Sequence, residues 1–137
     1  MTNELELEKI KAQLDKASND LTERIVKFES YLNSLKLGVA VWIPTNEETS
    51  IGYLKVEGGK WGIYVKYRPY TNADHVITRL VDGPRGLRLH GYKHLTELVP
   101  ALLETAKSLT ERIEKVLNQE KTNEQVYQLS HNESSTK

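Results

Sequence analysis

The sequence predicts an α+β fold in which a long N-terminal helix, a three- or four-stranded antiparallel meander and a C-terminal helix follow one another, with both helices on one face of the sheet. Three observations predict it. Apolar residues near both ends recur at three- and four-residue steps, the period of a helix. Apolar residues in the middle alternate, the period of a strand. A Gly-Gly pair separates two alternating segments, as in a β-hairpin.

The N-terminal helix is predicted over residues 4–36, with Gly38 as its stop signal. A break is the alternative, because Ser18-Asn19-Asp20 followed by Glu23 resembles a helix start. A continuous helix would be about 50 Å long, whereas the predicted strands span only about 25 Å. We therefore expect the excess helix to form a homodimer through an apolar stripe. That stripe consists of Leu7, Ile10, Leu14, Ala17 and Leu21.

Strands are predicted over residues 39–43, 50–57 and 60–67, with a possible fourth over 75–81. A two-residue turn at Gly58-Gly59 would place Val56 opposite Trp61 and Leu54 opposite Ile63 on the buried face. Tyr53, Tyr64, Lys55 and Lys66 would then share the outer face.

The C-terminal helix is predicted from residue 95 to about 118, with Pro100 in its first turn or at a kink. The segment 82–86 is rich in turn-forming residues. We expect one domain over residues 1–120. The polar tail over residues 121–137 holds too little apolar surface to order itself.

Composition excludes several classes of site. The chain has 137 residues and no cysteine, which removes disulfide frameworks, cysteine nucleophiles and cysteine-ligated metals. It holds 19 basic and 19 acidic residues, so bulk charge does not favour binding to nucleic acid. No apolar run approaches the roughly 20 residues of a membrane span, and the N-terminus lacks a secretory signal, so a cytoplasmic protein is expected.

The outer face of the hairpin is the first candidate binding surface, because aromatic rings beside lysines on a sheet can stack bases and neutralise phosphates. Its predicted members are Trp42, Tyr53, Lys55, Lys60, Tyr64 and Lys66. A second basic cluster, which could hold an anion or an acidic partner, comprises Arg79, Arg85, Arg88, His90, Lys93 and His94.

No catalytic residue, metal site or cofactor is predicted. His90, His94 and Glu97 have helical metal-ligand spacing, but Gly91 and Pro100 disfavour a regular helix there and no fourth ligand is evident. The sequence contains no nucleophile elbow, phosphate-binding loop or dinucleotide fingerprint.

The function expected from these patterns is a non-enzymatic binding module, a small adaptor or inhibitor-type protein that recognises a protein partner. The alternative is nucleic-acid or nucleotide binding through the basic and aromatic hairpin face. A small enzyme of unknown class is the remainder.

Overall fold

The computed structural model describes the backbone of residues 2–56 and 58–135, and the side chains of these residues as far as 123. Contacts divide the chain into two units that meet between Leu102 and Leu103. The first unit holds the sheet and the core. The second is a length of helix.

Helix α1 (Thr2–Leu35) opens the chain as one continuous helix, so the alternative break at residues 18–20 does not occur. Its apolar stripe packs against the core only in the second half of the helix, where Ile25 and Leu32 are buried. The helix ends where Lys36 and then Gly38 take positive φ angles of 50° and 69°. The Gly38 stop predicted from the sequence is therefore confirmed.

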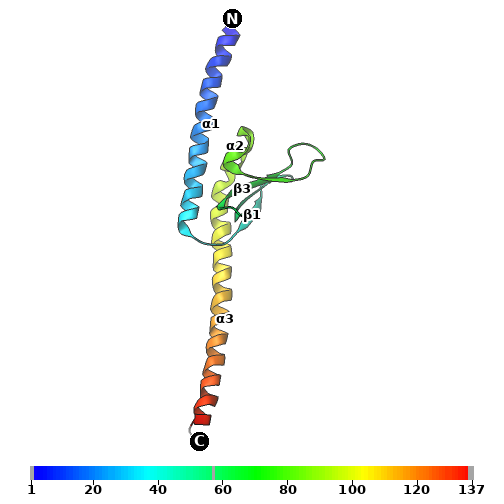
Figure 1. Ribbon diagram of the computed structural model, residues 1–137. Coiled ribbons are helices and arrows are strands. Elements are labelled where there is room, and N and C mark those ends of the chain that lie inside the picture. The colour runs from blue at the N-terminus through cyan, green and yellow to red at the C-terminus, as the bar shows by residue number, and fades with distance from the viewer. Residues whose placement is uncertain (1, 57, 136–137) are drawn as a thin grey trace. The chain divides into compact units, whose positions relative to one another are not determined.

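Four antiparallel strands follow α1 along the chain (Figure 1). Their order in the sheet is β1-β2-β3-β4. They are β1 (Val41–Pro44), β2 (Ser50–Lys55), β3 (Trp61–Tyr67) and β4 (Val76–Arg79). This meander between two long helices confirms the predicted fold class, with the possible fourth strand present. Each strand is shorter than its predicted segment, by between one and three residues.

The register between β2 and β3 differs by one residue from the prediction. Tyr53 lies opposite Ile63 and Lys55 opposite Trp61, because five residues rather than two connect the strands. The turn within this connection is closed by a hydrogen bond from Gly59 N–H to the Val56 carbonyl, 2.8 Å long. A one-residue slip moves every side chain of a strand to the other face. Val56 is consequently exposed, and the predicted pairing of Val56 with Trp61 is wrong.

The core lies on the face of the sheet that carries Tyr53 and Ile63. Helix α1 and the first turns of α3 (Leu98–Ser135) contribute to the same core, which places both helices on one face. Its fully or almost fully buried apolar side chains are Ile25, Leu32, Val39, Ile51, Tyr53, Ile63, Val65, Leu80, Leu95, Leu98 and Leu102.

Helix α2 (Arg85–His94) was not predicted. The turn predicted over residues 82–86 is only partly present: Asp82 ends a 3₁₀ turn, Pro84 stands at the cap position, and Arg85 and Gly86 already belong to the helix. Short 3₁₀ turns, η1 (Leu80–Asp82) and η2 (Leu95–Glu97), flank it. Pro100 is the third residue of α3, within the first turn as predicted.

The second unit consists of the remainder of α3. All described side chains from 110 to 123 are exposed. The side chains of the predicted disordered tail lie mainly outside the described residues, so its disorder stays a prediction. Among the described residues, no helix has the length and apolar character that crossing a bilayer requires.

Candidate functional site

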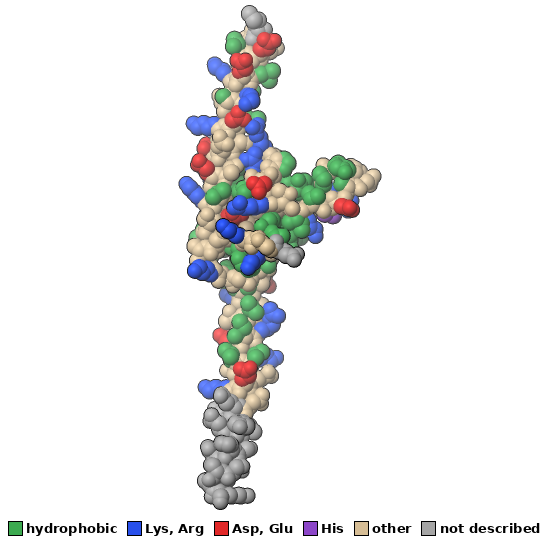
Figure 2. All heavy atoms as spheres, in the orientation of Figure 1, with side chains coloured by type: hydrophobic (Ala, Val, Ile, Leu, Met, Phe, Trp, Pro, Cys, Tyr) green, Lys and Arg blue, Asp and Glu red, His purple; other side chains and the backbone are tan. Residues whose placement is uncertain are grey.

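The outer face of the sheet, opposite the core, brings three of the six predicted hairpin residues together. Antiparallel partners share a face, so the register forms one row of Trp42, Gly52, Tyr64 and Arg79. The next row holds Pro44, Ser50, Lys66 and Ile77. Hydrophobic side chains are visible at the surface of the sheet in Figure 2. We use "outer sheet face" for these two rows.

The indole of Trp42 lies directly against the backbone of Gly52. A Cβ atom at Gly52 would stand only 2.6 Å from Trp42 Cε3, so no residue with a side chain fits beneath the ring. The Lys66 ammonium lies 5.9 Å from the centre of the indole, within the range of a cation–π interaction. Trp42 remains 39 % exposed, so an aromatic surface is fixed in place and still open to a ligand.

The charge of the strands is entirely positive. The four strands contain Lys55, Lys66 and Arg79 and no acidic residue. Lys66 is exposed beside Ile77, whose side chain is also about half exposed. The outer sheet face therefore combines apolar area with positive charge.

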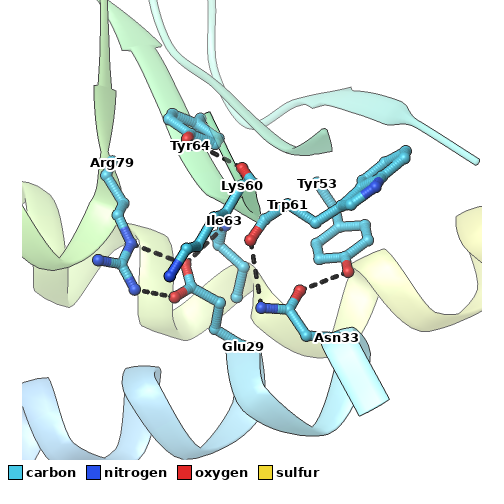
Figure 3. A network of polar contacts seen from close by, with 8 residues as sticks. All are labelled: Glu29, Asn33, Tyr53, Lys60, Trp61, Ile63, Tyr64 and Arg79. Atoms are coloured by element: carbon cyan, nitrogen blue, oxygen red, sulfur yellow. Dashed lines mark hydrogen bonds and ion pairs between the residues drawn. The ribbon is translucent and has the colours of Figure 1, made fainter. Parts of the chain in front are cut away.

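Arg79 is paired with a buried carboxylate. Glu29 of α1 pairs with the Arg79 guanidinium, and its Oε2 also accepts a hydrogen bond of 2.8 Å from Ile63 N–H (Figure 3). Ile63 lies one residue past the last β3–β4 pair, Tyr64 with Arg79. Because β4 ends before it could pair with Ile63, Glu29 accepts the hydrogen bond of Ile63 N–H in place of a strand carbonyl. This contact also attaches α1 to the sheet.

The other three predicted residues, Tyr53, Lys55 and Lys60, lie at a separate pocket. The one-residue register shift moves Tyr53 and Lys55 to the core face, where Tyr53 is buried. The pocket has a volume of about 450 Å³ and lies between the end of α1 and the β2–β3 connection. Its lining is Asn33, Lys36, Leu37, Gly38, Tyr53, Lys55, Gly59, Lys60 and Trp61.

The polar groups at the base of this pocket are already paired. Tyr53 donates a hydrogen bond of 2.6 Å to Asn33 Oδ1, and Asn33 Nδ2 donates to the Trp61 carbonyl, as Figure 3 shows. The Tyr53 and Trp61 rings stack with centroids 5.4 Å apart. Burial, and secondarily the charge of Glu29, raises the pKa of Tyr53. This network fastens the hairpin to α1, which gives it a structural role.

The second basic cluster is not one surface, because most of its members hold the fold together. Arg85 pairs with Asp15 at 2.5 Å, and Arg88 donates to Gly83 O and to Thr22 Oγ1. The contacts with Asp15 and Thr22 fasten α2 to α1. Lys93 is exposed.

The two histidines of this cluster have separate partners. His90 Nε2 lies 2.7 Å from Thr45 Oγ1, and His94 pairs with Glu97, while the imidazole centres are 4.9 Å apart. Burial, followed by the charges of His94 and Lys93, lowers the pKa of His90. Among the described residues there is no group of three or more His, Asp or Glu side chains placed to hold a metal ion.

The predicted dimer residues lie along the first half of α1. Leu7, Ile10 and Leu14 are exposed large apolar residues. Ala17 is exposed and Leu21 is half-buried.

Sequence reasoning missed Gly52, Ile77 and Glu29 as parts of these sites. A glycine inside a strand often marks the close approach of another group, and that signal was available for Gly52. Comparison with family models, with curated proteins and with solved structures finds no match for the chain.

Proposed function

We propose that this protein is a non-enzymatic binding module that recognises an acidic segment of a partner protein through the outer sheet face. One observation carries the proposal: Trp42 is seated on Gly52 in a way that excludes any side chain beneath it, yet the ring stays partly open. Partly exposed tryptophans held in a fixed orientation are frequent centres of protein interfaces.

The chemistry of the partner follows from the residues around Trp42. Ile77 and the indole offer apolar area, which favours an aliphatic or aromatic side chain in the ligand. Lys66 adds a positive charge, and the strands carry no acidic residue to neutralise it. An extended segment with a large apolar residue flanked by Asp or Glu complements this surface in both respects.

The test uses fluorescent peptides and the full chain, with binding followed by anisotropy. One peptide places leucine between aspartates, and a matched peptide places leucine between lysines. We expect the acidic peptide to bind and the basic one not to bind. Single-stranded oligothymidylate is the third probe, because Trp42 and Tyr64 could also stack bases.

Two matched variants locate the binding surface. Lys66→Glu reverses a charge on the outer sheet face, whereas Lys55→Glu makes the same change on the opposite face of the same sheet. We expect Lys66→Glu to weaken peptide binding at least about tenfold, as for a charge pair worth about 1.4 kcal/mol, and Lys55→Glu to have little effect. Equal effects of the two variants, or tighter binding of the oligonucleotide with a steep salt dependence, would contradict the proposal.

A further inference from the structure

The first half of α1 does not pack against the core of the chain. Every residue from 2 to 14 is exposed, and the set includes Leu7, Ile10 and Leu14 at 66 %, 55 % and 48 % exposure. Residues 2–17 extend about 24 Å, and an isolated helix of that length is only marginally stable in water. Such a helix needs a partner for its apolar side.

This exposed stripe continues the face with which α1 covers the sheet. Leu7 precedes Ile25 by eighteen residues, and Leu14 precedes Leu32 by the same distance, which is five full helical turns. Ile25 and Leu32 are buried in the core of the chain itself. The same side of the helix is therefore covered in its second half and uncovered in its first half.

A groove beside α2 extends the uncovered stripe. It has a volume of about 410 Å³, and its apolar walls include Leu14, Ala17 and Leu21 of α1 and Leu89 and Tyr92 of α2. Leu89 is itself about half exposed. An apolar helix placed along Leu7, Ile10 and Leu14 would reach this groove at its C-terminal end.

We propose that a second copy of the chain covers this stripe, with the two α1 helices parallel. In heptad terms Leu7, Leu14 and Leu21 occupy a positions, and Ile10 and Ala17 occupy d positions. Glu6 then falls at g and Lys11 at the following e position. A parallel pair brings Glu6 of each copy beside Lys11 of the other, which gives two attractive contacts.

The antiparallel alternative lacks this complementarity. Antiparallel helices bring e positions against e positions, so pairing Ile10 with Leu14 would set the two Lys11 ammonium groups opposite each other. Within one chain Lys11 contacts Asp15 at 2.8 Å, but Asp15 also accepts from Arg85. Lys11 can therefore contact Glu6 of a second copy, and Asp15 still has Arg85 as its partner.

The first experiment measures the molar mass of the full chain by light scattering after size-exclusion chromatography at increasing concentration. We expect a dimer at tens of micromolar, conversion to a monomer by Ile10→Glu, and no conversion by Leu5→Glu. Leu5 is the matched control because it is a 64 % exposed leucine on the other side of the same helix. A monomeric wild type, or equal loss of dimer in both variants, overturns the proposal.

The second experiment tests the parallel orientation. The chain has no cysteine, so Asn3→Cys introduces a single thiol at the d position preceding Glu6. Parallel helices bring the two thiols together, and mild oxidation should give a covalent dimer at high yield. Failure to cross-link in a sample shown to be dimeric overturns the parallel arrangement.

Charge reversal gives an independent check of the register. Glu6→Lys should weaken the dimer about tenfold or less, and the double variant Glu6→Lys with Lys11→Glu should restore it. Circular dichroism confirms that each variant keeps its helix content. Absence of rescue in the double variant contradicts the Glu6–Lys11 contact between copies.

Discussion

Glu29 is the buried polar residue that joins α1 to both β3 and β4. Glu29 is only 3 % exposed, and its carboxylate accepts hydrogen bonds from both the Arg79 guanidinium and Ile63 N–H. A buried charge is tolerated only when it is paired and hydrogen-bonded. The pair also raises the pKa of Arg79, chiefly through the hydrogen bond to Glu29.

Removing Arg79 should therefore cost more than neutralising Glu29. Arg79→Met leaves a buried carboxylate without its cation, and we expect a loss of about 3 kcal/mol in the free energy of unfolding. Glu29→Gln keeps an acceptor for Ile63 N–H, and the expected loss is about 1–2 kcal/mol. Urea denaturation measures both. The reverse order would show that the carboxylate reaches solvent when Arg79 is absent.

Gly52 determines the position of the Trp42 ring. Gly52→Ala should lower stability by about 1–3 kcal/mol through overpacking, because the new Cβ would meet both the indole and the Val41 carbonyl. It should also change the tryptophan fluorescence. Gly86→Ala is the control, because a Cβ in α2 at that position meets nothing within 4 Å. We expect that change to stabilise the chain by about 0.5–1 kcal/mol. A neutral Gly52→Ala would mean that the ring moves freely.

At the scale of elements, the hairpin shows where sequence patterns were insufficient. From the sequence pattern, either face of β2 could be the buried one. Ile51 and Tyr53 form an apolar set on one face, and Leu54 and Val56 form another on the opposite face. The register thus depended on the connection alone. Gly58 does take a positive φ of 70°, but in a longer loop than a two-residue turn. As a consequence, Trp61 pairs with Lys55 instead of Val56 and is half-buried.

Helix α2 was missed because its local sequence favours a turn. It contains Gly86 and Gly91 and follows Pro84, and glycine weakens a helix interior. Its helical form is supported by tertiary contacts, among them Arg88 with Thr22 and Arg85 with Asp15. Long periodic segments such as α1 were predictable because their pattern repeats over many turns. Short elements that depend on distant partners were not.

The contact of His90 in α2 with Thr45, in the connection between β1 and β2, should make stability depend on pH. Its pKa in the folded chain is lowered, first by burial and then by His94 and Lys93, from the ordinary value of 6.5. Below that pH the unfolded chain binds a proton more readily than the folded chain. Stability should therefore fall as the pH drops through 6.5 and level off once the folded chain is also protonated.

His90→Gln keeps a polar partner for Thr45 and removes the titration. We expect the loss of stability between about pH 7.5 and about pH 5 to be smaller in this variant than in the wild type. Denaturant melts at both pH values measure the difference. His75→Gln, at an exposed histidine 3.8 Å from Glu48, is the control. The same pH dependence in wild type and His90→Gln would contradict the assignment.

At the scale of the whole molecule, the residues that form the core and the residues that form exposed apolar surfaces lie in different parts of the chain. The buried apolar set ends at Leu102, and the second unit begins at Leu103. The described part of that unit exposes Ile113, Val116 and Leu117. Apolar periodicity predicted a C-terminal helix over residues 95 to about 118, whereas α3 spans Leu98–Ser135. Periodicity also does not reveal whether an apolar stripe is covered. Only the coordinates of the core could show that α3 contributes to it through its first turns alone.

This separation predicts that the fold tolerates loss of the C-terminal segment. A chain ending at residue 120 lacks no core residue, so its melting temperature should differ from that of the full chain by less than about 2 °C, or about 0.5 kcal/mol. A chain ending at residue 97 lacks Leu98 and Leu102, both buried, and should lose its cooperative melting transition. Calorimetry at equal protein concentration separates the two outcomes, because concentration alters the stability of any dimer. A large decrease for the longer variant would show that residues after 120 support the first unit.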